Sequence, residues 1–293
     1  MSDDAAASDP RPTKTRVEPI ALGQAERYRG TFAPTDATPA QGAELPAGWE
    51  GVYFPFDVAL ADLRPDGTPA RDGVLPEIDL PRRMYAGEDT EFLRPLRYGD
   101  EVTQTTALGS LVEKQGSRGR LVFVDLVREL AVGGEVAIRS TWHDVFLEAA
   151  DPDAPVRPPR REPEAASDAA WVDELALDAR QLFRFSALTF NTHLIHYDRG
   201  WATGEEGLED LLVHGPLTRI LLVDAARRRE ERAQRECGRA IASLQVRATA
   251  PMLVDRPLRL CGRTEEADDG AVTRVTALDA DDVVLATAEV RWR

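Results

Sequence analysis

The chain has 293 residues, of which 43% are hydrophobic and 30% charged, and this composition is typical of a globular protein. Its formal net charge of −15 argues against a nucleic-acid partner, because binding to phosphates requires a basic surface. No apolar run has the length of a membrane span, and the first residues lack the basic start and apolar core of a signal peptide. We therefore expect a cytoplasmic protein.

The first half of the chain begins with small, polar and proline-rich residues, and these predict a disordered tail over 1–16. Residues 18–33 are amphipathic and predict a helix. Alternating apolar residues separated by glycine turns then predict three antiparallel strands, near 101–113, 119–131 and 135–148. Together these elements predict a first domain over 17–150.

A segment rich in proline, charge and small residues (151–168) has the composition of a linker and divides the chain in two. In the second domain, 169–293, residues 215–236 predict a long helix, with Pro216 in its first turn and an apolar stripe that includes Leu217 and Ile220. Four antiparallel strands are predicted after it, near 241–249, 256–266, 271–279 and 283–292. Helix followed by sheet, twice over, predicts an α+β fold made of a duplicated unit, in which each sheet wraps one long helix.

The stretch FNTHLIHYDRGWA (190–202) contains two of the four histidines, His193 and His196. Their spacing of three could place both rings on one helix face, which makes a metal site one interpretation. Zinc needs three or four protein ligands, and the standard HExxH pattern is absent, so we expect no metal. Asp198 precedes a helical turn and is predicted to cap it.

Two motifs carry a family resemblance: FSALTFNTHLIHYD and, further along, VHGPLTRILLVD. Together they resemble the MaoC-like, R-specific enoyl-CoA hydratases and their fatty-acid-synthase dehydratase relatives, most of all the double-hotdog mesaconyl-C4-CoA (3-methylfumaryl-CoA) hydratase type. The resemblance implies two fused hotdogs, each a long helix wrapped by an antiparallel sheet. It also implies that the site lies in the second hotdog, because the first lacks the motif.

The family motif carries over residue by residue onto this segment. It places the catalytic histidine at His196, whereas the catalytic aspartate of the family falls on Asn191 and the family asparagine falls on His193. Leu194 stands where the relatives of the double-hotdog type commonly have arginine. Asn191 is usual among those relatives, so the site implied here keeps the histidine and lacks the carboxylate.

The chemistry of hydration favours the same residues. Adding water to an α,β-unsaturated thioester needs a base for the water proton, an acid for the α-carbon and donors for the enolate oxygen. Histidine suits the base because its ordinary pKa is near 6.5. We expect His196 to move the proton, alone or shared with His193, while the amide of Asn191 holds the water or the carbonyl. The backbone N–H of Gly215, at the start of the long helix, would stabilise the oxyanion.

Three further residues are assigned to substrate binding beside Gly215: His214, Tyr197 and Leu194. Several of the site residues also have a structural alternative. His193 and His214 could instead orient a loop, and Tyr197 could be a packing residue. His196 by itself could be a hydrogen-bonded structural histidine.

The leading hypothesis is a hydro-lyase that hydrates an enoyl thioester or dehydrates the hydroxyacyl product. No cofactor is expected, because CoA or the phosphopantetheine of an acyl carrier protein belongs to the substrate. The alternatives are conjugate addition of an amine, thioester hydrolysis and a non-catalytic acyl-binding subunit. Since one double hotdog already supplies a paired unit, both a monomer and a homo-oligomer fit the sequence.

Overall fold

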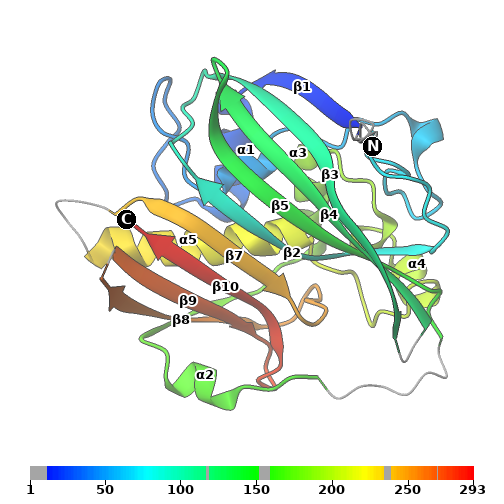
Figure 1. Ribbon diagram of the computed structural model, residues 1–293. Coiled ribbons are helices and arrows are strands. Elements are labelled where there is room, and N and C mark those ends of the chain that lie inside the picture. Colours follow the sequence, from blue (N-terminus) through cyan, green and yellow to red (C-terminus); the bar gives the residue numbers. More distant parts are fainter. Residues whose placement is uncertain (1–11, 117–118, 152–158, 234–238, 269) are drawn as a thin grey trace, which may run out of the picture.

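The computed structural model describes residues 12–116, 119–151, 159–233, 239–268 and 270–293 (Figure 1). Antiparallel strands dominate, and the helices pack against them, as the predicted α+β class requires. The first unit contains β1 (Thr13–Pro19), α1 (Leu22–Phe32), the 3₁₀ turns η1 (Trp49–Val52) and η2 (Leu60–Asp62), β2 (Arg82–Phe92), β3 (Glu101–Gly116), β4 (Gly119–Val132) and β5 (Glu135–Leu147). The short helix α2 (Pro163–Ser167) follows. The second unit contains β6 (Trp171–Leu175), α3 (Ala179–Thr189), η3 (Leu194–His196), α4 (Arg199–Gly204), α5 (Gly215–Ala233), β7 (Ile241–Ala248), β8 (Leu258–Ala267), β9 (Gly270–Leu278) and β10 (Val284–Trp292).

The ten strands in the described part of the chain belong to one sheet, whose order is β1-β3-β4-β5-β2-β7-β10-β9-β8-β6. The order of the first five strands is repeated in reverse by the last five, so β1 corresponds to β6 and β2 to β7. The two halves join where β2 pairs antiparallel with β7, from Gly87 opposite Arg247 to Glu91 opposite Ser243. This arrangement agrees with the duplicated unit predicted from the sequence, and it brings residues of the first unit beside the second.

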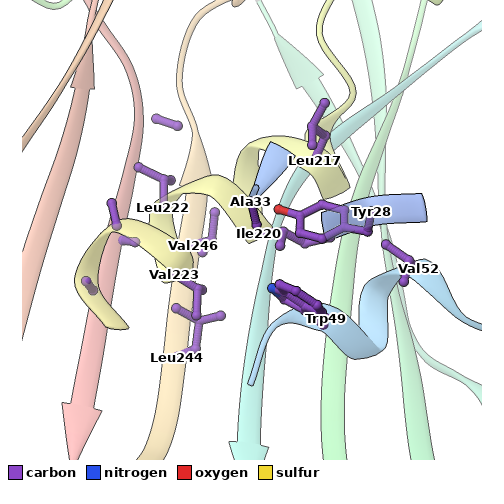
Figure 2. Packing of buried hydrophobic residues seen from close by; sticks show 14 of the residues in the cluster. Tyr28, Ala33, Trp49, Val52, Leu217, Ile220, Leu222, Val223, Leu244 and Val246 are labelled. Carbon is purple, nitrogen blue, oxygen red and sulfur yellow. The ribbon is translucent and has the colours of Figure 1, made fainter. Parts of the chain in front are cut away.

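Helix α5 lies against the sheet and crosses the junction of the two units (Figure 1). Leu217, Ile220 and Val223 are fully buried on it. Burying each such side chain contributes about 1.5–3 kcal/mol. Figure 2 shows that Tyr28 and Trp49 of the first unit pack beside this helix.

The contact between Tyr28, Trp49 and α5 is also polar. Asp224 of α5 is completely buried. It accepts hydrogen bonds from the hydroxyl of Tyr28 at 3.0 Å and the indole Nε1 of Trp49 at 2.9 Å. A buried carboxylate needs such partners. Asp224 therefore ties the helix of the second unit to the first.

The first unit departs from the prediction of a long central helix. Among its described residues the longest helix is α1, with 11 residues. Residues 33–81 follow as mostly irregular chain with two 3₁₀ turns. Proline and glycine are frequent there and interrupt any helix. The loop around Trp49 fills space against α5 instead.

The predicted boundaries are corrected at two places. Residues 1–11 of the expected tail lie outside the described residues, but Thr13–Pro19 is a strand that pairs with β3, because its alternating side chains fit the free edge. Within the expected linker, 152–158 lie outside the described residues. Residues 159–168 carry α2, whose Ala165 and Ala166 cover a small apolar cluster with Cys261. None of the helices in the described ranges is long and apolar enough to cross a membrane.

Candidate active site

The motif segment forms a tight series of turns between α3 and α4. Phe190 ends α3 in the left-handed conformation, with φ of 51°. Asn191 then accepts a hydrogen bond at its Oδ1 from the backbone N–H of His193, at 3.0 Å, and this side-chain turn sets the path of the loop. Asp198 accepts from the N–H of Trp201 at 2.9 Å and caps α4, as predicted.

His196 is buried and has a defined tautomer. Its Nδ1 donates to the carbonyl oxygen of Leu212 at 2.7 Å, so Nε2 carries the lone pair. The pKa of His196 is lowered to about 3, chiefly by burial and then by the neighbouring His193, while the bond to Leu212 acts in the opposite direction. His196 is therefore a neutral hydrogen-bond acceptor at pH 7, as a general base must be.

His193 lies beside His196, with ring centroids 5.4 Å apart and planes at 80°. Its pKa is also lowered to about 3, by burial first and then by Arg83 and Arg64. Nε2 of His193 is shut off from solvent and has no hydrogen-bond partner among the residues the structure describes. Nδ1 of the same ring is not among the atoms shut off in this way, and His193 is one of the residues that line the cavity described below.

His214, Tyr197 and Leu194, which the sequence assigned to substrate binding, are not among the described residues that line the cavity. His214 is completely buried and stacks on His196 with ring centroids 3.7 Å apart, while its Nε2 hydrogen-bonds Ser186. Tyr197 is exposed and donates its hydroxyl to the carbonyl of Thr192. The backbone N–H of Leu194 donates to the carbonyl of Asp66. His214 thus packs on His196, Tyr197 ties the motif loop to itself, and the backbone of Leu194 ties that loop to the first unit.

Gly215 begins α5 and lines the cavity. The first hydrogen bond of this helix runs from the N–H of Thr218 to the carbonyl of His214, so the preceding amides belong to the free first turn. Such a terminus favours negative charge. A side chain at Gly215 would collide with the ring of Tyr85, since a Cβ there would lie 2.2 Å from its Cδ1. The close packing of Tyr85 therefore requires glycine at this position.

These residues share a cavity of about 360 Å³ between the two units. Asn191, His193, His196 and Gly215 form its polar side in the second unit. The rest of the wall is largely apolar, and comes from both units: Phe56, Met84, Tyr85, Trp142, Ile195, Leu212, Val246 and Met252. A mostly apolar cavity with a few converging polar groups is the usual form of a small-molecule site.

Two arginines at the start of β2, Arg82 and Arg83, also line the cavity and were missed from the sequence. Nε of Arg82 lies 2.6 Å from a carboxylate oxygen of Glu206. Arg83 is buried between Asp144 at 2.5 Å and Asp72 at 2.6 Å. Two adjacent arginines do not by themselves indicate a site in the sequence. The pairing of β2 with β7 brings them to the cavity.

No group of three or more histidine, cysteine, aspartate or glutamate side chains in the described ranges is arranged to hold a metal ion. The remaining histidine, His143 on β5, hydrogen-bonds Asp125 at 2.7 Å and Asp89 at 3.3 Å. It does not line the cavity formed by the described residues. The polar groups that line the cavity thus include imidazoles, an amide side chain and a helix terminus of the second unit, together with Arg82 and Arg83 of the first.

The chain is similar to known proteins over most of its length. Residues 48–254 match the family model of hydroxyacyl-thioester dehydratase type 2. A mesaconyl-C(4)-CoA hydratase of Chloroflexus aurantiacus is 35% identical over 251 residues, which cover 86% of each chain.

Solved structures match the fold. HtdX from Mycobacterium tuberculosis has a TM-score of 0.65 at 20% identity, covering 96% of this chain and 99% of that one. A second M. tuberculosis protein, described as a double hotdog, has a TM-score of 0.58 at 13% identity, covering 96% of both chains. The double-hotdog prediction is confirmed by these matches. The chain belongs to the hydroxyacyl-thioester dehydratase type 2 family, and it is a hydro-lyase that interconverts hydroxyacyl and enoyl thioesters.

Proposed function

We propose that the cavity between the two units hydrates the double bond of an enoyl-CoA reversibly. One observation carries the proposal: two neutral imidazoles, the amide of Asn191 and the N-terminus of α5 converge on one largely apolar cavity. Hydration needs a base beside a bound water and donors beside the thioester oxygen, and these four groups supply both.

The water would lie between His193 and His196. Nε2 of His196 carries a lone pair, and Nδ1 is the nitrogen of His193 that is not shut off, so we place both acceptors beside one water in the cavity that these residues line. One imidazole takes a proton while the oxygen attacks the β-carbon, and the proton then passes to the α-carbon. Two neutral rings suit this step, because a ring that is already protonated could accept neither a hydrogen bond nor a proton from the water.

The thioester oxygen would face the start of α5. The N–H of Gly215 lies in the free first turn, where the helix dipole stabilises the charge that develops on the enolate oxygen. Asn191 uses Oδ1 for its own loop, which leaves the two N–H bonds of Nδ2 as donors. An aspartate at this position would repel the enolate, so Asn191 suits an oxyanion donor better than a base.

For the carrier we favour CoA, because the Chloroflexus relative acts on a CoA thioester by its name. The apolar wall suits the hydrocarbon part of an acyl group, and a volume of about 360 Å³ suits a short one. A complete wall comes from a single chain, so we propose that the monomer is sufficient for activity.

The test is a panel of crotonyl-, mesaconyl- and longer enoyl-CoA substrates, followed by loss of the enone absorbance. We expect hydration of at least one, and a loss of about 100-fold or more in kcat for His196→Gln. His143→Gln is the matched control, since its ring lies on β5 among Asp125 and Asp89 and should leave kcat unchanged.

Other products would contradict the proposal. Release of free thiol would indicate a thioesterase, and a mass gain equal to an added amine, with no hydration, would indicate conjugate addition. Binding without turnover, unaffected by His196→Gln, would indicate an acyl-binding subunit.

A further inference from the structure

A loop of the first unit, Arg64–Thr68, docks on the catalytic segment of the second. The N–H of Leu194 donates to the carbonyl of Asp66 at 2.8 Å, and the hydroxyl of Thr192 donates to the carbonyl of Gly67 at 2.7 Å. Gly67 has a φ of +83°, and a Cβ there would lie 1.9 Å from the carbonyl oxygen of Thr192. The backbone therefore fixes the position of this loop against His193.

The side chain of Asp66 is 2% exposed and points toward His193. Its Oδ1 accepts from the N–H of Thr68 at 2.8 Å and from the hydroxyl of Thr68 at 2.7 Å. Its Oδ2 has no hydrogen-bond partner within the described residues, and lies 4.0 Å from Nε2 of His193, which is likewise unpartnered there. Two buried polar atoms left without partners are costly, and here they face each other.

We propose that Asp66 accepts a hydrogen bond from Nε2–H of His193 in the working enzyme, and so makes His193 the ring that stores the proton. The inference rests on the proposed hydration. A hydrogen bond spans about 2.7–3.2 Å, so the pair has to close by about 1 Å when substrate fills the cavity. Asp66 is a positioning residue: it does not reach the cavity, and it acts through the far nitrogen of His193.

The proton balance follows from this geometry. Water gives a proton to Nδ1 of His193 as its oxygen forms the bond to the β-carbon. The π electrons move to the thioester oxygen, and the enolate then takes the proton from Nδ1 at the α-carbon. The carboxylate of Asp66 stabilises the imidazolium through the bond to Nε2, so the first unit supplies the carboxylate that position 191 lacks.

His196 is less suited to storing the proton. Its Nδ1 donates to a neutral carbonyl, and its face stacks on the neutral His214. Its lone pair at Nε2 can hold the water instead.

The charged groups near His193 act on its protonation in opposite directions. Arg83 and Arg64 disfavour its protonation. Arg83 is compensated by Asp72 and Asp144, and Arg64 lies 3.7 Å from Asp66 through its Nε. Asp66 is thus the carboxylate that faces the ring directly.

The experiment compares Asp66→Asn with Asp66→Ala in the full-length protein. Asparagine keeps an oxygen for Thr68 but can donate its N–H₂ to Nε2 of His193, which forces the proton onto Nδ1 and blocks the base. We expect kcat on the fastest enoyl-CoA of the panel to fall about 100-fold or more in Asp66→Asn, and less in Asp66→Ala, although Asp66→Ala is the less stable protein. A purely structural Asp66 predicts the reverse order of kcat. Asp62→Asn, exposed in the same unit, should behave as wild type.

A second measurement needs no turnover. The ¹⁵N resonances of the histidine rings report which nitrogen carries the proton, and His193→Gln assigns the signal. We expect Nε2–H in the wild type and Nδ1–H in Asp66→Asn. A wild-type Nδ1–H ring, or greater loss of kcat in Asp66→Ala, would overturn the proposal. If no enoyl-CoA is hydrated, the proposed function fails, and the ring tautomer still decides the role of Asp66.

Discussion

The ring of Tyr85 in the first unit occupies the place where a side chain at residue 215 of the second unit would lie. A Cβ on Gly215 would be 2.2 Å from Cδ1, 2.5 Å from Cγ and 2.8 Å from Cβ of Tyr85. The start of α5 and strand β2 therefore meet with no spare space at the edge of the cavity. A larger side chain at residue 215 is therefore expected to displace the ring of Tyr85, and a change at Tyr85 is expected to alter the packing of the start of α5.

Gly215→Ala is expected to destabilise the protein by about 1–3 kcal/mol, because the added methyl group collides with a packed ring. Turnover should fall as well, since Tyr85 and the first turn of α5 both line the cavity. Urea unfolding and the hydration assay measure the two effects. Gly204→Ala is the matched control, because a Cβ there meets nothing within 4 Å. Wild-type stability in Gly215→Ala would contradict the packing described here.

Tyr85→Phe tests the other side of the same contact. The hydroxyl of Tyr85 is buried and has no hydrogen-bond partner in the described ranges, while its ring packs on Trp142 with centroids 4.7 Å apart. Removing an unsatisfied buried hydroxyl should leave the free energy of unfolding unchanged or raise it by about 1 kcal/mol. Because the oxygen does not reach the cavity, kcat/KM should stay within a factor of about three. A clear loss of stability would show that the hydroxyl has a partner.

Arg219 on α5 holds two buried carboxylates of the first unit. It is 2% exposed, and its guanidinium lies 2.5 Å from Glu50 and 3.3 Å from Glu88. Burial alone would lower its pKa, but Glu88 and Glu50 together raise it. Arg219→Met leaves both carboxylates without their cation and should cost about 3–5 kcal/mol in urea unfolding.

The control for this ion pair is Arg274→Met. Arg274 pairs with Glu265 at 2.7 Å, but both side chains are about half exposed. A pair of this kind contributes at most about 1 kcal/mol. Equal losses in the two variants would mean that burial does not govern the contribution of Arg219.

The elements that sequence predicts well here are those with a regular pattern. The last three strands of the first unit and the four strands after α5 alternate clearly, and each lies within a few residues of its predicted range. Strand β2 was missed because a register shift between Tyr85 and Gly87 breaks its alternation. The irregular residues 33–81 have no period at all, so the sequence did not predict the loop around Trp49 that packs against α5.

For the site, too, the sequence predicts residues that lie close together along the chain and not those brought in from the other unit. Asn191, His193, His196 and Gly215, which the motifs singled out, all line one cavity. Asp66 and Tyr85 come from the other unit, and only the pairing of β2 with β7 and the docked Arg64–Thr68 loop bring them to it. Nothing in the local sequence around Asp66 distinguishes it from an ordinary turn aspartate.

The buried histidines predict how stability depends on pH. In the folded protein the pKa values of His193 and His196 are lowered to about 3, by burial first, whereas the unfolded chain has a value near 6.5. Between these values the unfolded state binds more protons, so stability is complete above about pH 6.5 and is lost as the pH falls toward about 3. Each histidine adds a slope of up to about 1.4 kcal/mol per pH unit.

Urea unfolding at pH 8, 7, 6 and 5 measures this slope in a range where most carboxylates remain ionised. We expect the free energy of unfolding to be level from pH 8 to 7 and to fall from pH 6 to 5. His196→Gln should reduce the slope of the free energy of unfolding against pH by the contribution of one histidine, because glutamine does not titrate. A wild-type free energy that stays level down to pH 5 would mean that the folded rings take up protons over the same pH range as the unfolded chain, and burial would then not be what keeps them neutral.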